Sequence, residues 1–94
     1  MFNCIEQMNF DVAIVKKNGV EIGVFATTMD IINDKMQAHN LIKYCEEKIL
    51  VGYQVVLMAQ DTRGIPHYYG KQDLVSLLEA TNFSKIHFRR YTKS

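Results

Sequence analysis

The stretch Tyr53-Gln-Val-Val-Leu-Met-Ala-Gln-Asp-Thr-Arg-Gly-Ile-Pro-His-Tyr-Tyr-Gly70 decides how the second half of this chain folds. Apolar residues run without interruption through 55–59, and the turn sequence Asp61-Thr-Arg-Gly64 follows, with Asp and Gly at the positions they favour in a type I turn. A polar and aromatic segment then returns and ends at Gly70, before a helical pattern. We therefore expect a hairpin over 53–69, followed by the start of a helix.

Pro66 is the only proline of the chain and lies in the returning segment. Proline has no backbone N–H to donate to a sheet, so the strand that contains it is expected at a sheet edge, or the proline at a bulge. The unbroken apolar run at 55–59 indicates a strand covered on both faces. Gly70 is expected to let the chain turn into the next helix.

A second hairpin is predicted upstream, over 12–26. Two apolar segments flank Asn18-Gly19, the dipeptide that a type I′ turn prefers. A two-residue loop sets the register, so Lys17 pairs with Val20 and Lys16 with Glu21. One face of the hairpin is then apolar and expected to be buried; it carries Ala13, Val15, Ile22 and Val24. The opposite face holds the Lys16 and Glu21 pair.

Helical spacing marks two further segments. Apolar residues recur at Ile31, Ala38, Ile42, Cys45 and Ile49, which predicts a helix over 28–50, with a threonine hydroxyl at its N-terminus. A helix of that length is long for so small a domain, and a break near His39-Asn40 is the alternative. A second helix is predicted over 71–81, with a leucine stripe at 74, 77 and 78.

The chain closes with the alternating segment 86–91, which predicts a short strand. Ile86 and Phe88 would face one way, and His87, Arg89 and Tyr91 the other. The lead-in 1–10 has apolar residues without a clear period and gives no definite element. The element order is ββαββαβ. We expect one domain over 1–94, an α+β two-layer sandwich with a mainly antiparallel sheet of about five strands and two helices on one face.

Composition excludes several functional classes. The 94 residues have a net charge of +1, are 48% hydrophobic and 22% charged, and contain no apolar run long enough to cross a membrane. Two cysteines do not make a disulfide framework, so both thiols are expected to be free in a cytoplasmic protein. No membrane partner is expected. Positive charge gathers at the C-terminal end, where four of the last ten residues are Lys or Arg.

No catalytic or metal constellation stands out. The three histidines lie far apart in sequence, and no His-x-x-x-His or Cys-x-x-Cys spacing occurs. No serine lies on a glycine-flanked elbow between a strand and a helix. We therefore expect a protein that is not an enzyme and that holds neither a metal nor a cofactor.

Aromatic and cationic side chains are the remaining functional signal, because such residues are enriched at binding hot spots. Turn and edge chemistry account for Asp61, Gly64 and Pro66, but not for the other polar residues nearby. The predicted binding residues are Arg63, His67, Tyr68, Tyr69, His87, Arg89 and Tyr91. They would form one surface if the fourth and fifth strands were neighbours.

The expected function is association with another protein, most simply a second copy of the same chain, through an open sheet edge. The alternative is binding of nucleic acid by the basic and aromatic strand between His87 and Lys93. A related alternative is RNA cleavage, which requires His67 and His87 to meet as general acid and base on neighbouring strands.

Overall fold

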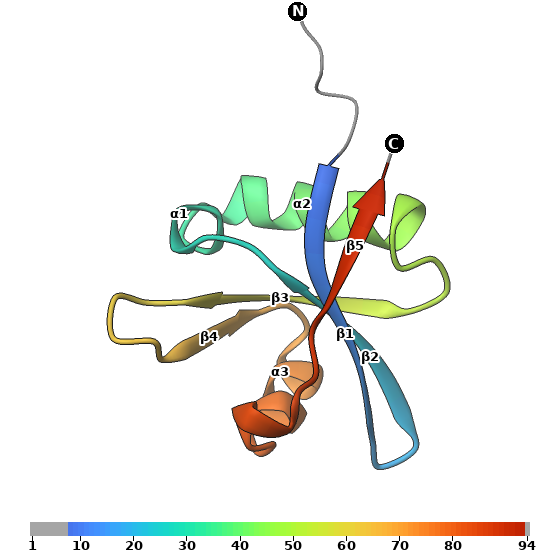
Figure 1. Ribbon diagram of the computed structural model, residues 1–94, viewed down its shortest axis with the longest axis vertical. Coiled ribbons are helices and arrows are strands. Elements are labelled where there is room, and N and C mark those ends of the chain that lie inside the picture. Colours follow the sequence, from blue (N-terminus) through green and yellow to red (C-terminus); the bar gives the residue numbers. More distant parts are fainter. Residues whose placement is uncertain (1–7, 94) are drawn as a thin grey trace, which may run out of the picture.

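The computed structural model describes residues 8–93 (Figure 1). Of the lead-in over 1–10, residues 1–7 and the expected free thiol of Cys4 lie outside these residues, and residues 8–10 belong to the first strand. The elements in chain order are β1 (Met8–Lys17), β2 (Val20–Ala26), α1 (Met29–Ile32), α2 (Lys35–Lys48), β3 (Gln54–Gln60), β4 (Pro66–Tyr69), α3 (Gln72–Glu79), the 3₁₀ turn η2 (Phe83–Lys85) and β5 (Arg89–Lys93). No helix among these is long and apolar enough to cross a membrane.

The β1–β2 hairpin has the predicted register. Lys17 pairs with Val20 and Lys16 with Glu21. Asn18 and Gly19 both have positive φ, at 53° and 78°, as a type I′ turn requires. The Lys16 ammonium lies 3.7 Å from the Glu21 carboxylate, on the solvent-exposed side of the pair.

The five strands form one sheet in the order β4-β3-β2-β1-β5. Three of the four pairings are antiparallel, and β2 pairs with β3 in parallel. The α+β class with about five strands is therefore confirmed, with a mixed sheet. A parallel pair needs a crossover connection, and α1 and α2 provide it between β2 and β3.

The expected placement of both helices on one face is wrong. The α2 helix packs on one face of the sheet and α3 on the other, so the sheet lies between two helical layers (Figure 1). The cause is visible in β3, where Val55 and Leu57 face α2 while Val56 and Met58 face α3. The unbroken apolar run that predicted a doubly covered strand is thus confirmed.

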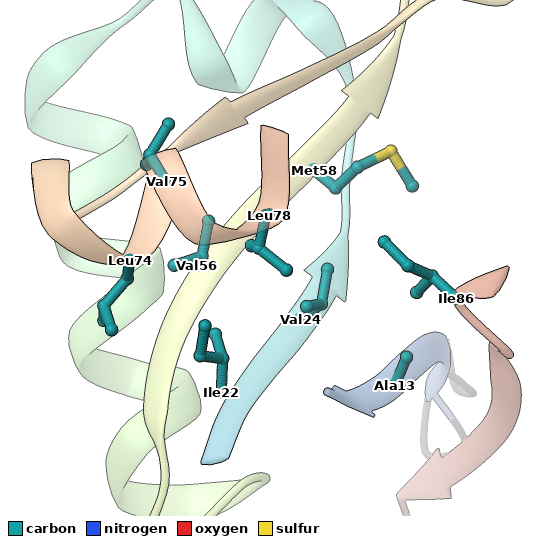
Figure 2. Packing of buried hydrophobic residues seen from close by; sticks show 9 residues of the cluster. All are labelled: Ala13, Ile22, Val24, Val56, Met58, Leu74, Val75, Leu78 and Ile86. Carbon is teal, nitrogen blue, oxygen red and sulfur yellow. The ribbon is translucent and has the colours of Figure 1, made fainter. Parts of the chain in front are cut away.

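Figure 2 shows the core on the α3 face. Leu78 is fully buried against Val24 and Val56, and Ile86 covers the small side chain of Ala13. On the α2 face, the core is built from Phe25, Ala38, Cys45, Ile49, Leu50, Val55 and Leu57. Each helix contributes an apolar stripe at helical spacing, which explains why both stripes were visible in the sequence.

The predicted helix over 28–50 is two helices, and the break lies at Asn33-Asp34 rather than at His39-Asn40. Asp34 is the N-cap of α2, and its Oδ1 accepts hydrogen bonds from the backbone N–H groups of Met36 and Gln37. The Gln37 side-chain amide also donates to Asp34 Oδ2 at 2.9 Å, and this bond, together with the two backbone bonds, lowers the pKa of the Asp34 carboxyl. Thr28 precedes α1 but makes no capping hydrogen bond through its side chain, so the expected threonine cap is wrong.

Two other boundaries shift. The second predicted helix is shorter, since α3 covers Gln72–Glu79. The final strand lies at Arg89–Lys93 rather than at 86–91. Residues 86–88 form the connection from η2, and they place Ile86 in the α3-side core before the chain reaches the sheet edge. The burial of Ile86 therefore delays the start of β5.

Candidate functional site

The predicted binding residues occupy opposite edges of the sheet. His67, Tyr68 and Tyr69 lie on β4, while Arg89 and Tyr91 lie on β5. The order β4-β3-β2-β1-β5 separates these edge strands by four spacings, or about 19 Å at roughly 4.8 Å per spacing. The seven residues therefore form no single surface. His67 and His87 cannot act as a general acid and base pair.

The β4 edge is explained by its own turn. Asp61 Oδ1 accepts hydrogen bonds from the N–H groups of Arg63 and Ile65, and His67 Nε2 lies 2.9 Å from Asp61 Oδ2. The hydrogen bond from His67 is the largest cause of the lowered pKa of the Asp61 carboxyl. His67 thus fastens the turn to β4, and the side chain of Arg63 projects from it, exposed.

Pro66 closes the outer side of β4. The Asp61 N–H donates to the Ile65 carbonyl at 3.0 Å. Because backbone groups alternate along an antiparallel ladder, those of His67 point toward β3, whereas those of Pro66 and Tyr68 point away from the sheet. The proline has no N–H to offer to an added strand. The prediction that Pro66 lies on an edge strand is confirmed.

Both tyrosines of β4 are half-buried, and each packs against one of the two cores. Tyr69 packs with the α2-side core and Tyr68 with the α3-side core. The Tyr68 hydroxyl is buried without a hydrogen-bond partner among the described residues. Burial, together with the nearby Glu79 carboxylate, raises the pKa of Tyr68. Neither ring offers a fully exposed contact surface.

The basic and aromatic strand is divided between two faces of the sheet. Arg90 turns toward Asp11, with its Nε 2.9 Å from Asp11 Oδ1. Tyr91 lies opposite Phe10, and its partly buried ring packs with the α2-side core. Arg89 and His87 remain exposed. Fewer residues of the basic and aromatic strand therefore share one exposed surface than its sequence predicted.

An unpaired segment of β1 lies beside these two residues. The β5 strand pairs with β1 only from Met8 to Val12, whereas β1 continues to Lys17 (Figure 1). Lys17 flanks the two-residue turn, so its backbone N–H and C=O groups bond to β2. These groups alternate in direction along the strand, and those of Ile14 and Lys16 therefore point away from β2. Within residues 8–93, no strand pairs with the backbone N–H and C=O groups of Ile14 and Lys16 on that side.

A hollow of about 320 Å³ lies beside β1, just before the first residue of β5. It is lined by Val12, Ala13, Ile14, His87 and Arg89. Ile14 is 45% exposed, which is high for an isoleucine in a strand next to the core. An empty space, unpaired backbone groups and an exposed apolar side chain coincide here. We call the hollow and the free side of Ala13–Lys17 the edge site.

Two of the charged side chains around the edge site already have polar partners. Lys16 is paired with Glu21, and the Lys17 ammonium reaches the opposite face, 3.0 Å from Thr81 Oγ1. Arg89 is exposed and lies opposite Val12, and His87, two residues earlier in the chain, lines the same hollow. The closed end of the hollow therefore carries positive charge.

The sequence indicated His87 and Arg89 but missed Ile14 and Lys16. The alternation of β1 made Ile14 an ordinary outward residue of a hairpin, and nothing in the residues showed where β5 would begin. The mismatch that leaves Ile14 uncovered appears only in the structure, where β1 has ten residues and β5 has five. The register of β5 on β1 then shows that the uncovered part of β1 is Ala13–Lys17.

A second groove, of about 470 Å³, separates α2 from the β4–α3 connection. Lys35, His39 and Lys71 lie on its rim, and its one carboxylate, Glu46, accepts a hydrogen bond from the Val55 N–H at 3.0 Å. Among the described residues, no group of His, Cys, Asp and Glu side chains is arranged to hold a metal. Burial and Glu46 raise the pKa of Cys45 to about 12, so its thiol is unreactive.

Comparison with protein-family models, with curated proteins and with solved structures gave no match for this chain.

Proposed function

We propose that this protein binds an extended segment of another protein, which adds to the sheet as a strand at the edge site. The observation that carries the proposal is the unpaired side of β1 at Ile14 and Lys16, next to an empty hollow where a strand would lie. Strand addition is a general mode of peptide recognition, in which backbone hydrogen bonds provide affinity and alternate side chains provide specificity.

The ladder at this edge is short. Two residues that face outward offer two N–H donors and two C=O acceptors, so an added strand can form four backbone hydrogen bonds. Each such bond contributes about 0.5–1.5 kcal/mol net, and ordering the segment costs part of that gain. The expected dissociation constant is therefore weak, about 0.1–1 mM for an isolated peptide.

A second copy of the chain fits this edge poorly. If two β1 strands met with Ile14 opposite Lys16, the Asn18-Gly19 turn of one copy would lie level with Val12 of the other. That position is already taken by Arg89, which pairs with Val12. The occupant that fits is a segment of a different protein.

The sequence of a suitable probe follows from the register. A residue opposite Ile14 meets an exposed apolar side chain, one opposite Val15 lies beside a half-buried one, and one opposite Lys16 can supply a carboxylate. The labelled heptapeptide Gly-Ser-Thr-Glu-Val-Val-Val meets these needs when its penultimate valine lies opposite Ile14. Fluorescence anisotropy during titration with the protein measures its binding.

Backbone methylation of the probe tests the ladder without altering the protein. Methylation of the penultimate valine nitrogen removes the donor that faces Ile14, and we expect binding to weaken at least 10-fold. Methylation of the valine before it changes a nitrogen that points away from β1 and should leave binding within 2-fold. Equal effects at both positions, or no binding of the unmodified peptide at about 1 mM protein, would refute strand addition at the edge site.

A further inference from the structure

We infer that the segment bound at the edge site is the free C-terminus of its protein, and that Arg89 and His87 receive the terminal carboxylate. This inference rests on the proposed function, because it specifies the end of the strand that the edge site accepts. It follows from which end of the hollow is closed and from the charge found there.

The hollow is open toward the β1–β2 turn and closed at the other end. Arg89 begins β5 opposite Val12 and so occupies the next position along the edge. The chain before it leaves the edge, because Ile86 is buried in the α3-side core. An added strand beside Ala13–Lys17 is therefore collinear with β5 and cannot continue along the sheet past Val12. It must either end there or leave the edge.

The charge at the closed end selects the direction of the strand. Arg89 and His87 line that end, and both are exposed. No carboxylate among residues 8–93 lines the hollow, and the carboxylates of Glu21 and Asp11 are paired with Lys16 and Arg90. An N-terminal ammonium would face a cation, whereas a C-terminal carboxylate would face a complementary guanidinium. The segment thus runs antiparallel to β1, in the same direction as β5.

The first measurement compares the heptapeptide with a free C-terminus and the same peptide with a C-terminal amide. We expect amidation to weaken binding at least 10-fold, because it removes the charge that Arg89 faces. The Arg89→Gln variant should bind the free acid as weakly as the wild type binds the amide, and it should bind the amide with unchanged affinity. The Arg90→Gln variant is the matched control, since Arg90 lies on the other face, beside Asp11.

The outcomes separate the inference from the proposed function. If acid and amide bind within 2-fold of each other while methylation still discriminates between neighbouring valines, the strand is added but its terminus is not read, and the inference is overturned. If Arg90→Gln weakens the acid as much as Arg89→Gln does, the effect is one of general charge and the inference also fails. If methylation does not discriminate, the proposed function itself fails.

Discussion

The two edges of this sheet are protected in different ways. At the β4 edge, a single proline removes an outward donor, and the hydrogen bonds of Asp61 fix the turn that precedes it. At the other edge, β5 covers only the first half of β1 and leaves Ile14 and Lys16 unpaired among the described residues. Natural sheets usually block their edges against added strands, so the unpaired backbone groups of Ile14 and Lys16 are the feature on which the proposed strand addition rests.

The sharpest way to test the open edge is to place a proline in each of two neighbouring positions of β1. Val15→Pro removes an N–H that bonds to β2, and we expect a loss of about 2–3 kcal/mol or more in the free energy of unfolding. Ile14→Pro removes an outward N–H and should cost much less stability, yet abolish measurable binding of the heptapeptide. Urea denaturation and anisotropy measure the two effects. Equal destabilisation by both prolines would show that Ile14 is not at an open edge.

The reverse change should open the closed edge. Pro66→Val restores an outward donor beside Tyr68, and β4 could then pair with β4 of a second molecule. We expect sedimentation velocity to show a mass that rises with concentration in this variant and not in the wild type. Gln60→Val is the control. Gln60 lies on β3 opposite Pro66, so this change adds a valine without adding a backbone donor at the sheet edge. A strictly monomeric Pro66→Val protein would mean that the proline is not what protects this edge.

A smaller effect is expected at Tyr68, whose hydroxyl is buried without a partner among the described residues. Tyr68→Phe removes a polar group that gains no hydrogen bond from burial, so the variant should be more stable, by about 1 kcal/mol. Thermal and urea unfolding measure the change. Tyr69→Phe serves for comparison and should have little effect. A destabilised Tyr68→Phe variant would show that the hydroxyl does have a partner.

The smallest effect concerns the turn at the β4 edge. The pKa of Asp61 is lowered from its ordinary value of 3.8 by hydrogen bonds that form only in the folded protein, so its contribution to stability is present above pH 3.8 and is lost as the pH falls through the lowered value. Asp61→Asn should therefore melt below the wild type at neutral pH, and the difference should shrink in acid. Melting curves across this range check the sign. A difference that grew in acid would contradict the role of Asp61.

Local chemistry explains which predictions succeeded. The Asn18-Gly19 turn fixes the β1–β2 register because its two positive φ angles suit those residues. The absence of an N–H on Pro66 restricts its strand to an edge, whatever the rest of the fold is. The break between α1 and α2 was misplaced because the Asp34 cap was not distinguished from the other polar residues of that segment. Thr28 had the right chemistry for a cap but does not make the bond.

The site could be predicted only in part, because its two halves come from different levels of structure. His87 and Arg89 were identified by their side-chain types. Ile14 belongs to the site because no strand pairs with its outward backbone groups among the described residues. That gap arises because Ile86 is buried in the α3-side core, and β5 begins only at Arg89. The predicted surface that joined Arg63, His67, Tyr68 and Tyr69 to the C-terminal strand required β4 and β5 to be neighbours. They are the two outermost strands.

The sequence by itself determined the two hairpins, the edge position of Pro66, the two apolar helical stripes and the doubly covered run at β3, because each depends on the geometry of a few adjacent residues. Tertiary structure decided the faces on which α2 and α3 pack, the parallel pairing of β2 with β3, and the length of β1 that β5 covers. These depend on contacts between segments far apart in the chain, whose pairing no local pattern of residues specifies. The edge site exists only at that level.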